Sequence, residues 1–444
     1  MADLESKHIR PKLSEVCVYG RKQDDEFVGI RYNDGKLNVY FPFGYSKPAS
    51  GEEHDYREDI LNLISVLSTY SKESQGAAEN YQLNDENVQF PIHAYIHVFN
   101  YFLNHGYYVE NESIYKQAKS GKINWSKTIK QVRPQIAGDF PNESVVYLDF
   151  ITKKSAHNEN ELITQIHKYC VYEAYEKIGC LFGFMQPEKA TIPFNAKLFI
   201  AVLRTRMANT FNEKHLLLFR NMLDIICYLG KREDNRKASF GTSDFEYVWE
   251  GLIDHVFGIE DKDKYFPHCI WKIGKEEEKL DWRSEKRTAL RPDTIMELQA
   301  DCKMIFILDA KYYQYPRTLP GSGSILKQIA YAEFVETMTK EIPGQAGNDI
   351  YNAFILPYAA ENGCNTETAY RLENFGYAEC EWRKGDAENA KPYERIYGIL
   401  LDVRSIMQRH TQHSDDDIAE LRRIIMEKVP ERFRVRDSDR HAMP

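Results

Sequence analysis

A run of five apolar residues, Met304–Leu308, turns polar at Asp309. A run of this length that is rich in Ile and Phe and does not alternate predicts a strand buried on both faces. The segment 294–299 before it predicts a partner strand, and the polar residues 301–303 predict the turn between them. The pattern therefore predicts a hairpin near the middle of the C-terminal half.

Helical spacing of apolar residues dominates on both sides of this hairpin. Upstream, a stripe over 245–256 predicts a helix, and Ser243 with Glu246 three residues later fits a capping box at its start. Downstream, a Gly-Ser loop at 321–324 precedes a helical pattern over 325–335. The remaining elements predicted in this half are strands at 350–357 and 393–403 and an amphipathic helix at 415–428.

The N-terminal half shows two other patterns. Alternating segments at 27–32 and 36–41 flank Asn33-Asp34-Gly35, which is a hairpin signal, and they predict a small β-rich module. A helix over 57–70 and a polar loop over 71–86 are expected next. Four further helices are predicted at 92–106, 161–182, 196–211 and 215–229.

Together these patterns predict an α+β multidomain chain. A length of 444 residues suits two or three domains, and a charged stretch at 231–237 marks the clearest boundary. The predicted parts are a β-rich N-terminal module at 1–86, a mainly helical region with a basic segment at 87–236, an α/β core with a mixed central sheet flanked by helices at 237–410, and a C-terminal helix and tail at 411–444.

The predicted hairpin gathers candidate catalytic residues. Side chains alternate along a strand, so Asp309 and Lys311 share one face, about 7 Å apart along the chain. The returning strand would bring Asp293 close to Asp309, and Pro292 suits a strand entrance. Carboxylate oxygens are the ligands that Mg²⁺ prefers, and a divalent cation beside a phosphodiester activates a water molecule. The residues themselves therefore predict a metal-dependent nuclease with Asp293 and Asp309 as metal ligands.

Lys311 is expected either to position the attacking water or to neutralise charge on the phosphate. The alternative is that Asp-x-Lys arises by chance and that Asp309 caps a turn. A charged pair directly after five apolar residues is costly to bury without a partner, which favours the functional interpretation.

A third acid is expected from the helix upstream of the hairpin. Glu250 lies at the edge of its apolar stripe and could reach the metal, with Glu246 as the fallback and a solvated helix glutamate as the alternative. Downstream, Lys327 and Gln328 could contact the DNA backbone or orient the site, since a helix N-terminus favours phosphate. Gln328 could equally be an ordinary helix surface residue.

A basic segment offers a candidate DNA contact. From Lys116 to Arg133 there are six Lys or Arg and no acid, at a spacing that predicts several on one side of a helix. The alternatives are a solvated basic face or a contact with an acidic partner protein. The residues predicted to bind DNA are Lys119, Lys122, Trp125, Lys127 and Lys130 here, and Arg291, Lys327 and Gln328 near the hairpin.

Composition limits the remaining classes of function. A net charge of −9 does not exclude DNA binding, because the local field decides it. The eight cysteines form no C-x-x-C pair, which disfavours a zinc site and fits a cytoplasmic protein. We find no signal peptide and no apolar run of membrane-spanning length. No G-x-x-x-x-G-K-[ST] motif occurs, so any nucleotide-driven step must come from another chain.

These residues resemble the PD-(D/E)xK nuclease superfamily, matched by Asp293, Asp309 and Lys311, with Glu250 as the helix acid. The segment 121–130, Phe-Glu-x-x-Trp-Glu at 245–250, Leu-Asp-Ala-Lys-Tyr-Tyr at 308–313 and Lys327-Gln328 narrow the likeness to the LlaJI family of restriction endonucleases, over most of 110–400. The chain departs from the pattern at Ser324, where an aspartate is more familiar.

The resemblance implies a type II-like restriction enzyme that cuts double-stranded DNA at a specific sequence. It implies a PD-(D/E)xK core, Mg²⁺ as cofactor with Mn²⁺ expected to substitute, and kinship with McrC, which works with a GTP-hydrolysing McrB-like motor. A homodimer is one possible assembly. The alternatives are a nuclease subunit active only with such a GTPase partner, a non-cleaving DNA-binding module of the same fold, and a repair or junction-resolving nuclease.

Overall fold

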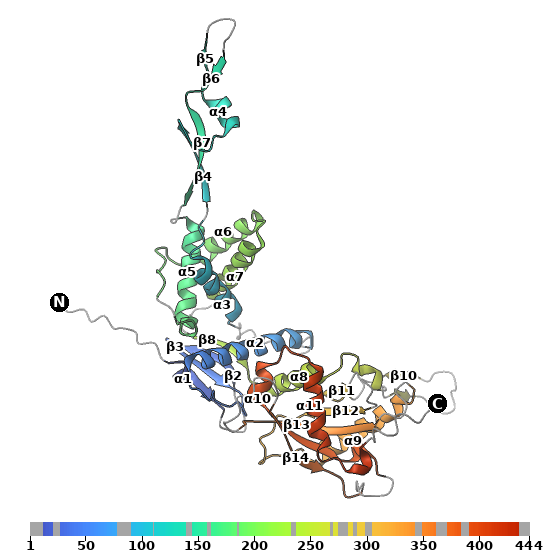
Figure 1. Cartoon of the computed structure of the whole chain (residues 1–444). Coiled ribbons are helices and arrows are strands. Elements are labelled where there is room, and N and C mark those ends of the chain that lie inside the picture. Colours follow the sequence, from blue (N-terminus) through green and yellow to red (C-terminus); the bar gives the residue numbers. More distant parts are fainter. Residues whose placement is uncertain are drawn as a thin grey trace, which may run out of the picture. The chain divides into compact units, whose positions relative to one another are not determined.

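The computed structural model divides the chain into two compact units (Figure 1). Unit 1 comprises Met1–Arg31, Asn38–Asn84 and Gly241–Pro444, and unit 2 comprises Tyr32–Leu37 and Asp85–Phe240. The structure describes residues 12–20, 27–77, 90–109, 111–138, 144–157, 161–183, 186–231, 237–266, 270–273, 283–286, 291–297, 304–341, 349–360, 371–382 and 390–434. Helices and both parallel and antiparallel strands are present, which confirms the predicted mixture of α and β structure.

The centre of unit 1 is a five-stranded sheet with the order β11-β12-β13-β15-β14. Its strands are β11 Thr294–Glu297, β12 Met304–Ala310, β13 Asp349–Tyr358, β14 Leu372–Ala378 and β15 Ile396–Asp402. The three inner strands are parallel, and the two outer ones are antiparallel to their neighbours. Every residue of β12 and β15 is buried, as an apolar run without alternation predicts.

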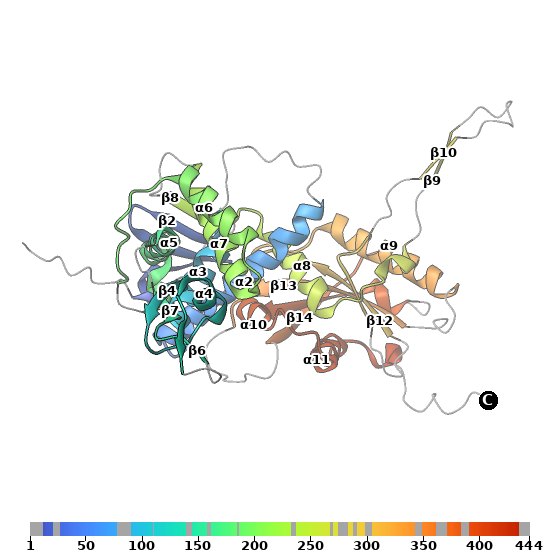
Figure 2. The same ribbon diagram turned by 90° about the horizontal axis from the view of Figure 1, so that it is seen from above.

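Helices cover this sheet. They are α8 Phe245–Phe257, α9 Ser322–Thr339, α10 Val403–Gln408 and α11 Asp415–Met426. Ile329 and Val335 of α9 share an apolar cluster with Ile307 of β12, while α11 packs on β14 and β15. Figure 2 shows α9 and α11 on opposite sides of the strands. The mixed sheet with flanking helices was expected from the sequence.

The starts of two helices differ from their predictions. No side chain caps α8, because Ser243 Oγ bonds to the Asp244 carboxylate, so the predicted capping box is wrong. Helix α9 begins at Ser322 rather than at 325, so part of the predicted Gly-Ser loop is helical. The predicted turn at 301–303 lies outside the described residues.

The N-terminal segment forms α1 Leu13–Val16, α2 Glu53–Ala77 and three strands, β1 Cys17–Tyr19, β2 Val28–Asn33 and β3 Lys36–Phe41. With β8 Lys237–Thr242 these strands make a sheet of order β1-β3-β2-β8. Asp34 and Gly35 both have positive φ, 48° and 84°, which the predicted hairpin turn requires. Helix α2 extends to Ala77, so the first part of the predicted loop is wrong, and 78–86 lies outside the described residues.

Unit 2 contains the four helices predicted for the middle of the chain. They are α3 Ile92–His105, α5 Leu162–Ile178, α6 Ala196–Ala208 and α7 Glu213–Gly230, with the 3₁₀ turn η2 Gly179–Leu181 after α5. The Asn195 and Asn212 side chains cap α6 and α7 by accepting backbone N–H bonds.

The basic segment is largely not helical. Residues 111–157, which we call the arm, form the antiparallel pair β4 Asn111–Ala118 and β7 Phe150–His157, the short helix α4 Trp125–Gln131, and the small hairpin β5 Gln135–Ala137 and β6 Ser144–Val146. Lys116 lies in a strand and only Lys127 and Lys130 lie in α4. The prediction of one basic helical face is therefore wrong, because the segment pairs with residues far along the chain.

Short elements complete the structure. They are η3 Lys262–Tyr265, the strand pair β9 Ile270–Ile273 and β10 Arg283–Lys286, η4 Pro392–Glu394 and η5 Glu431–Phe433. Within the part of the chain that the structure describes, no helix is both long and apolar enough to cross a membrane.

Candidate active site

The β11–β12 hairpin brings the first two acids together. Its register pairs Thr294 with Leu308, and continuing it by one residue sets Asp293 opposite Asp309. The Asp293 Oδ2 atom accepts a hydrogen bond of 3.0 Å from the backbone N–H of Ala310. The side chain of Asp293 is thus fixed to the strand that carries Asp309, as the hairpin predicted.

Lys311 follows Asp309 at the end of β12. Its backbone N–H donates to the carbonyl of Ile355 at 2.9 Å, so the main chain stays tied to β13 here. Its ammonium Nζ lies 2.5 Å from Oδ2 of Asp309. The aspartate is almost fully buried, so a neighbouring cation is what makes its charge tolerable there.

Helix α8 delivers Glu250 to the same place. The preceding residue, Trp249, is fully buried, and its indole N–H donates to the carbonyl of Ile355 at 3.4 Å. The Tyr312 ring packs against both Phe245 and Trp249, with centroids 5.4 and 6.3 Å away. These contacts hold α8 beside the end of β12, next to Lys311.

The electrostatics of the site reflect three carboxylates in a half-buried space. Burial raises the pKa of Asp293 to about 7, and the charges of Asp309 and Glu250 add to the rise. Burial also raises the pKa of Glu250, helped by Asp309 and opposed by Lys311. The three acids therefore repel one another when all are ionised. A bound cation would offset this repulsion.

Lys311 is the main cation facing these acids. Burial alone would lower its pKa, but the hydrogen bond to Asp309 and the charges of Asp309 and Asp293 raise it above the ordinary value. The ammonium therefore stays charged at neutral pH.

The main chain of Asp293 is held as well. Lys262 Nζ of η3 lies 2.6 Å from the Asp293 carbonyl oxygen and 2.6 Å from Asp254 Oδ2. The sequence analysis missed Lys262 and the packing role of Tyr312. A lysine in a short polar turn carries no sequence signal, whereas the position of Tyr312 directly after Lys311 is a signal for its packing role.

The predicted residues on α9 have different surroundings. Lys327 is exposed; its pKa is raised by a hydrogen bond with Tyr331 and by the charges of Asp309 and Asp293, which places its ammonium within the field of the site. Gln328 is only 1% exposed and donates to the carbonyl of Ile307 at 2.8 Å. The burial rules out an ordinary helix surface residue and agrees with the alternative that Gln328 orients the site through β12, while its contact with DNA stays a prediction.

The other predicted DNA contacts lie elsewhere. Arg291 is exposed, close to Asp293 in the chain, and forms a surface ion pair of 3.0 Å with Asp263. Lys119, Lys122, Trp125, Lys127 and Lys130 all belong to the arm, in unit 2. The arm also exposes apolar side chains, with Trp125 53%, Ile129 62% and Ile136 71% accessible. Lys127 Nζ lies 3.3 Å from the centroid of the Tyr115 ring.

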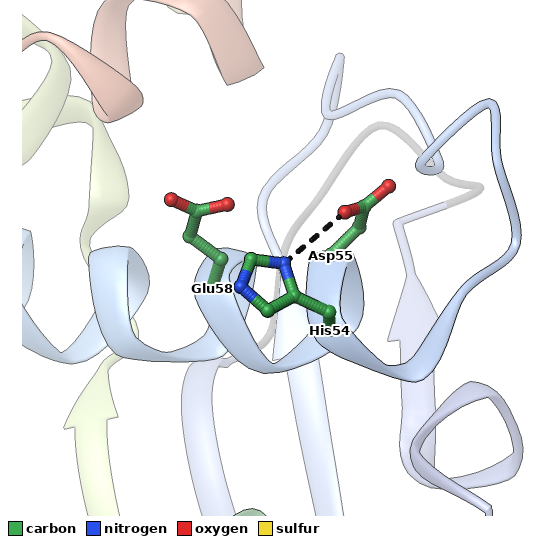
Figure 3. A group of neighbouring side chains, drawn as sticks. All are labelled: His54, Asp55 and Glu58. Carbon is green, nitrogen blue, oxygen red and sulfur yellow. Dashed lines mark hydrogen bonds and ion pairs between the residues drawn. The ribbon is translucent and has the colours of Figure 1, made fainter.

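Two groups of residues could bind a cation. Asp293, Asp309 and Glu250 offer carboxylate oxygens, the donors that hard divalent cations prefer. Within the described residues, the group whose three ligand atoms all lie within 4.8 Å of one another is instead His54, Asp55 and Glu58, on the exposed side of α2 (Figure 3). The His54 cluster is open to solvent and its Asp55 bonds to Ser50, so the less exposed Asp293, Asp309 and Glu250 fit a functional cation better.

Comparisons with known proteins concern the chain as a whole. Residues 27–375 match the family model described as LlaJI restriction endonuclease. The Type II restriction enzyme BsuMI component YdjA of Bacillus subtilis (strain 168) is 26% identical over 352 residues, which cover 74% of this chain and 71% of that relative.

Among solved structures, a half-complex of Thermococcus gammatolerans McrB AAA+ hexamers with bound McrC is similar at 14% identity. It covers 87% of this chain and 82% of that one, with a TM-score of 0.33. A score this low does not show that the two chains share a fold or a partner.

Proposed function

The chain belongs to the LlaJI restriction endonuclease family, and on that premise we propose that it hydrolyses phosphodiester bonds of double-stranded DNA with a divalent cation, at a specific sequence. The observation that carries the proposal is the meeting of Asp293, Asp309, Glu250 and Lys311 at the end of β12. The β11–β12 hairpin with Pro-Asp at its entrance and Asp-Ala-Lys at its exit matches the PD-(D/E)xK pattern, and the mixed sheet of unit 1 would be the nuclease core.

Asp293, Asp309 and Glu250 would hold Mg²⁺, or Mn²⁺ in its place. When bound, the cation polarises the phosphoryl oxygen and makes the attacking water more acidic. Three carboxylates suit Mg²⁺, which keeps several of its own waters and rarely needs a closed protein cage. The mutual charge repulsion among these acids favours binding of a cation between them.

Lys311 has two tasks in this proposal. Its ammonium neutralises the carboxylate of Asp309, and it can orient the attacking water or stabilise the charge that develops on the phosphate. Lys327 would receive a phosphate of the DNA strand, which its exposure and the nearby charges of Asp309 and Asp293 support. The basic arm residues would contact the DNA backbone.

A second candidate function keeps the chemistry but makes it depend on a partner. The relative in Bacillus subtilis is described as a component of a restriction enzyme, which favours an assembly of more than one chain. The apolar side chains exposed on the arm favour the same view, because a DNA contact alone has little use for Ile129 and Ile136. In this form an McrB-like GTPase would supply the nucleotide-driven step.

The two candidates separate in one experiment. The purified chain is incubated with unmethylated phage DNA, with Mg²⁺ or with EDTA. Discrete fragments that require Mg²⁺ support a self-sufficient enzyme, whereas cutting that occurs only after a GTPase partner and GTP are added supports the second form. Absence of cutting under both conditions rejects the nuclease proposal.

A further inference from the structure

Lys262 bridges two parts of the candidate active site that are distant in sequence. Its Nζ lies 2.6 Å from the carboxylate of Asp254 and 2.6 Å from the carbonyl oxygen of Asp293. Asp254 is in α8, four residues after Glu250, and residues four apart lie on the same side of a helix. The bridge therefore links the helix that carries one predicted metal ligand to the main chain of another.

The local chain is shaped for this bridge. Gly258 ends α8, and a Cβ there would lie 2.6 Å from Asp254 Oδ1 and 2.4 Å from the Asp254 carbonyl oxygen. Only glycine leaves room for the aspartate in its present position. The next residue, Ile259, donates its backbone N–H to the carbonyl of Ile295 at 2.9 Å, which draws the segment leading to Lys262 against β11.

We propose that Lys262 is a positioning residue that sets the separation between Glu250 and Asp293 for divalent cation binding. The inference rests on the proposed function. Asp293 is held at two points, by Ala310 at its carboxylate and by Lys262 at its carbonyl. Without Lys262, the side chain would remain attached to β12, but α8 would lose its ionic link to the loop before β11. Glu250 would then be held only by the packing of Trp249 and Phe245 at the end of β12, so its distance from Asp293 would be less tightly set.

The charge of Lys262 and its positioning role predict opposite changes in cation affinity when the lysine is removed. A positive charge near a cation site repels the cation, so removing it would by charge alone tighten cation binding. Loss of a group that orients metal ligands weakens binding, by about 10-fold to 100-fold in known sites. The direction of the change therefore identifies which role Lys262 plays.

The test is calorimetric titration of the full chain with Mn²⁺ alone, without DNA. We expect Lys262→Met to bind Mn²⁺ about tenfold more weakly than the unaltered chain. Lys262→Arg, which can still reach both oxygens, should recover most of the affinity. Lys264→Met is the matched control, because Lys264 lies on the same turn but pairs with Glu297 at 3.5 Å. Its affinity should not change.

Thermal unfolding of each variant accompanies the titrations, and Asp254→Asn provides a milder break of the same bridge if Lys262→Met fails to fold. Unchanged or tighter Mn²⁺ binding by folded Lys262→Met, or by Asp254→Asn in its place, would overturn the positioning role while leaving the proposed nuclease intact. No Mn²⁺ binding by the unaltered chain would instead reject the cation site itself, and the positioning role with it.

Discussion

The carboxylate of Asp293 accepts a hydrogen bond of 3.0 Å from the backbone N–H of Ala310, the residue between Asp309 and Lys311. This contact joins the entrance of β11 to the exit of β12. It explains how a Pro-Asp pair and an Asp-Ala-Lys triplet, 16 positions apart when counted from Asp293 to Asp309, act at one place.

Cation binding should release protons near neutral pH. Burial and neighbouring acids raise the pKa of Asp293 to about 7, so its carboxyl is about half protonated at pH 7 without metal. A cation needs the ionised form, so Mn²⁺ binding at pH 7 should release about half a proton, and less at pH 8.5. Calorimetry in two buffers of different ionisation enthalpy measures this, with the same titrations at pH 8.5 as the control. Proton release that does not fall between pH 7 and 8.5 would contradict the raised pKa.

A buried ion pair should matter more to stability than an exposed one. Asp59 of α2 is fully buried and accepts bonds of 3.0 and 3.1 Å from Nε of Arg404 in α10. Arg404→Ala should lower the free energy of unfolding by about 3–5 kcal/mol, because it leaves a buried carboxylate without its cation. Arg423→Ala is the matched control, since its pairs with Glu420 and Glu427 are exposed. Equal losses of unfolding free energy for the two variants, measured by urea unfolding, would contradict the greater weight of the buried pair.

Unit 2 should become less stable in mild acid because of His167. Burial lowers the pKa of this imidazole to about 3, and its Nδ1 accepts a bond of 2.8 Å from the backbone of Tyr108. Between pH 6.5 and 3 the unfolded chain binds a proton that the folded chain does not, so stability falls as the pH falls. From pH 6.5 to 4.5 the loss is up to about 2–3 kcal/mol.

His167→Asn isolates that contribution, because an amide oxygen can replace Nδ1 as the acceptor but does not titrate. Unfolding of the two proteins is followed at several pH values by fluorescence of the aromatic residues. The variant should show a flatter decline between pH 6.5 and 4.5. Parallel curves would mean that His167 does not carry the acid sensitivity.

Much of the candidate site follows from sequence patterns. The apolar run of β12 and the polar residues that end it predicted the meeting of Asp293, Asp309 and Lys311. The helical stripe around Trp249 likewise placed Glu250 beside them. In these cases neighbouring residues decide the structure, because strand burial and helix periodicity are local signals.

The parts that were missed depend on distant partners. The strands of the arm pair residues 111–118 with 150–157. Because each strand depends on this distant partner, its own sequence does not predict it. Gln328 is buried against the carbonyl of Ile307, to which it donates. The sequence of a helix does not show that one of its polar residues has such a partner. Lys262 matters through the Asp293 carbonyl, a backbone atom present at every position. The joining of the N-terminal segment to the C-terminal half in unit 1 is equally invisible to local patterns.

The arm offers a test of DNA contact. Lys130 is exposed on α4, the helix that begins at the exposed Trp125. If Lys130 binds a phosphate, Lys130→Ala should weaken binding to all DNA sequences and lower the salt dependence of the affinity by about one unit of slope. Fluorescence anisotropy at several salt concentrations measures both quantities. Lys340→Ala, at the end of α9, is the control. Unchanged slopes for both would remove Lys130 from the DNA interface.

The central claim is that Asp309 and Lys311 form the reactive end of a DNA-cutting site. Cleavage of unmethylated phage DNA by Asp309→Asn and by Lys311→Met tests it most directly, under whichever condition allows the unaltered chain to cut. We predict that both variants keep the fold and DNA affinity but cleave about 10²-fold to 10³-fold more slowly or not at all. Cleavage by either folded variant at the rate of the unaltered chain would contradict the account.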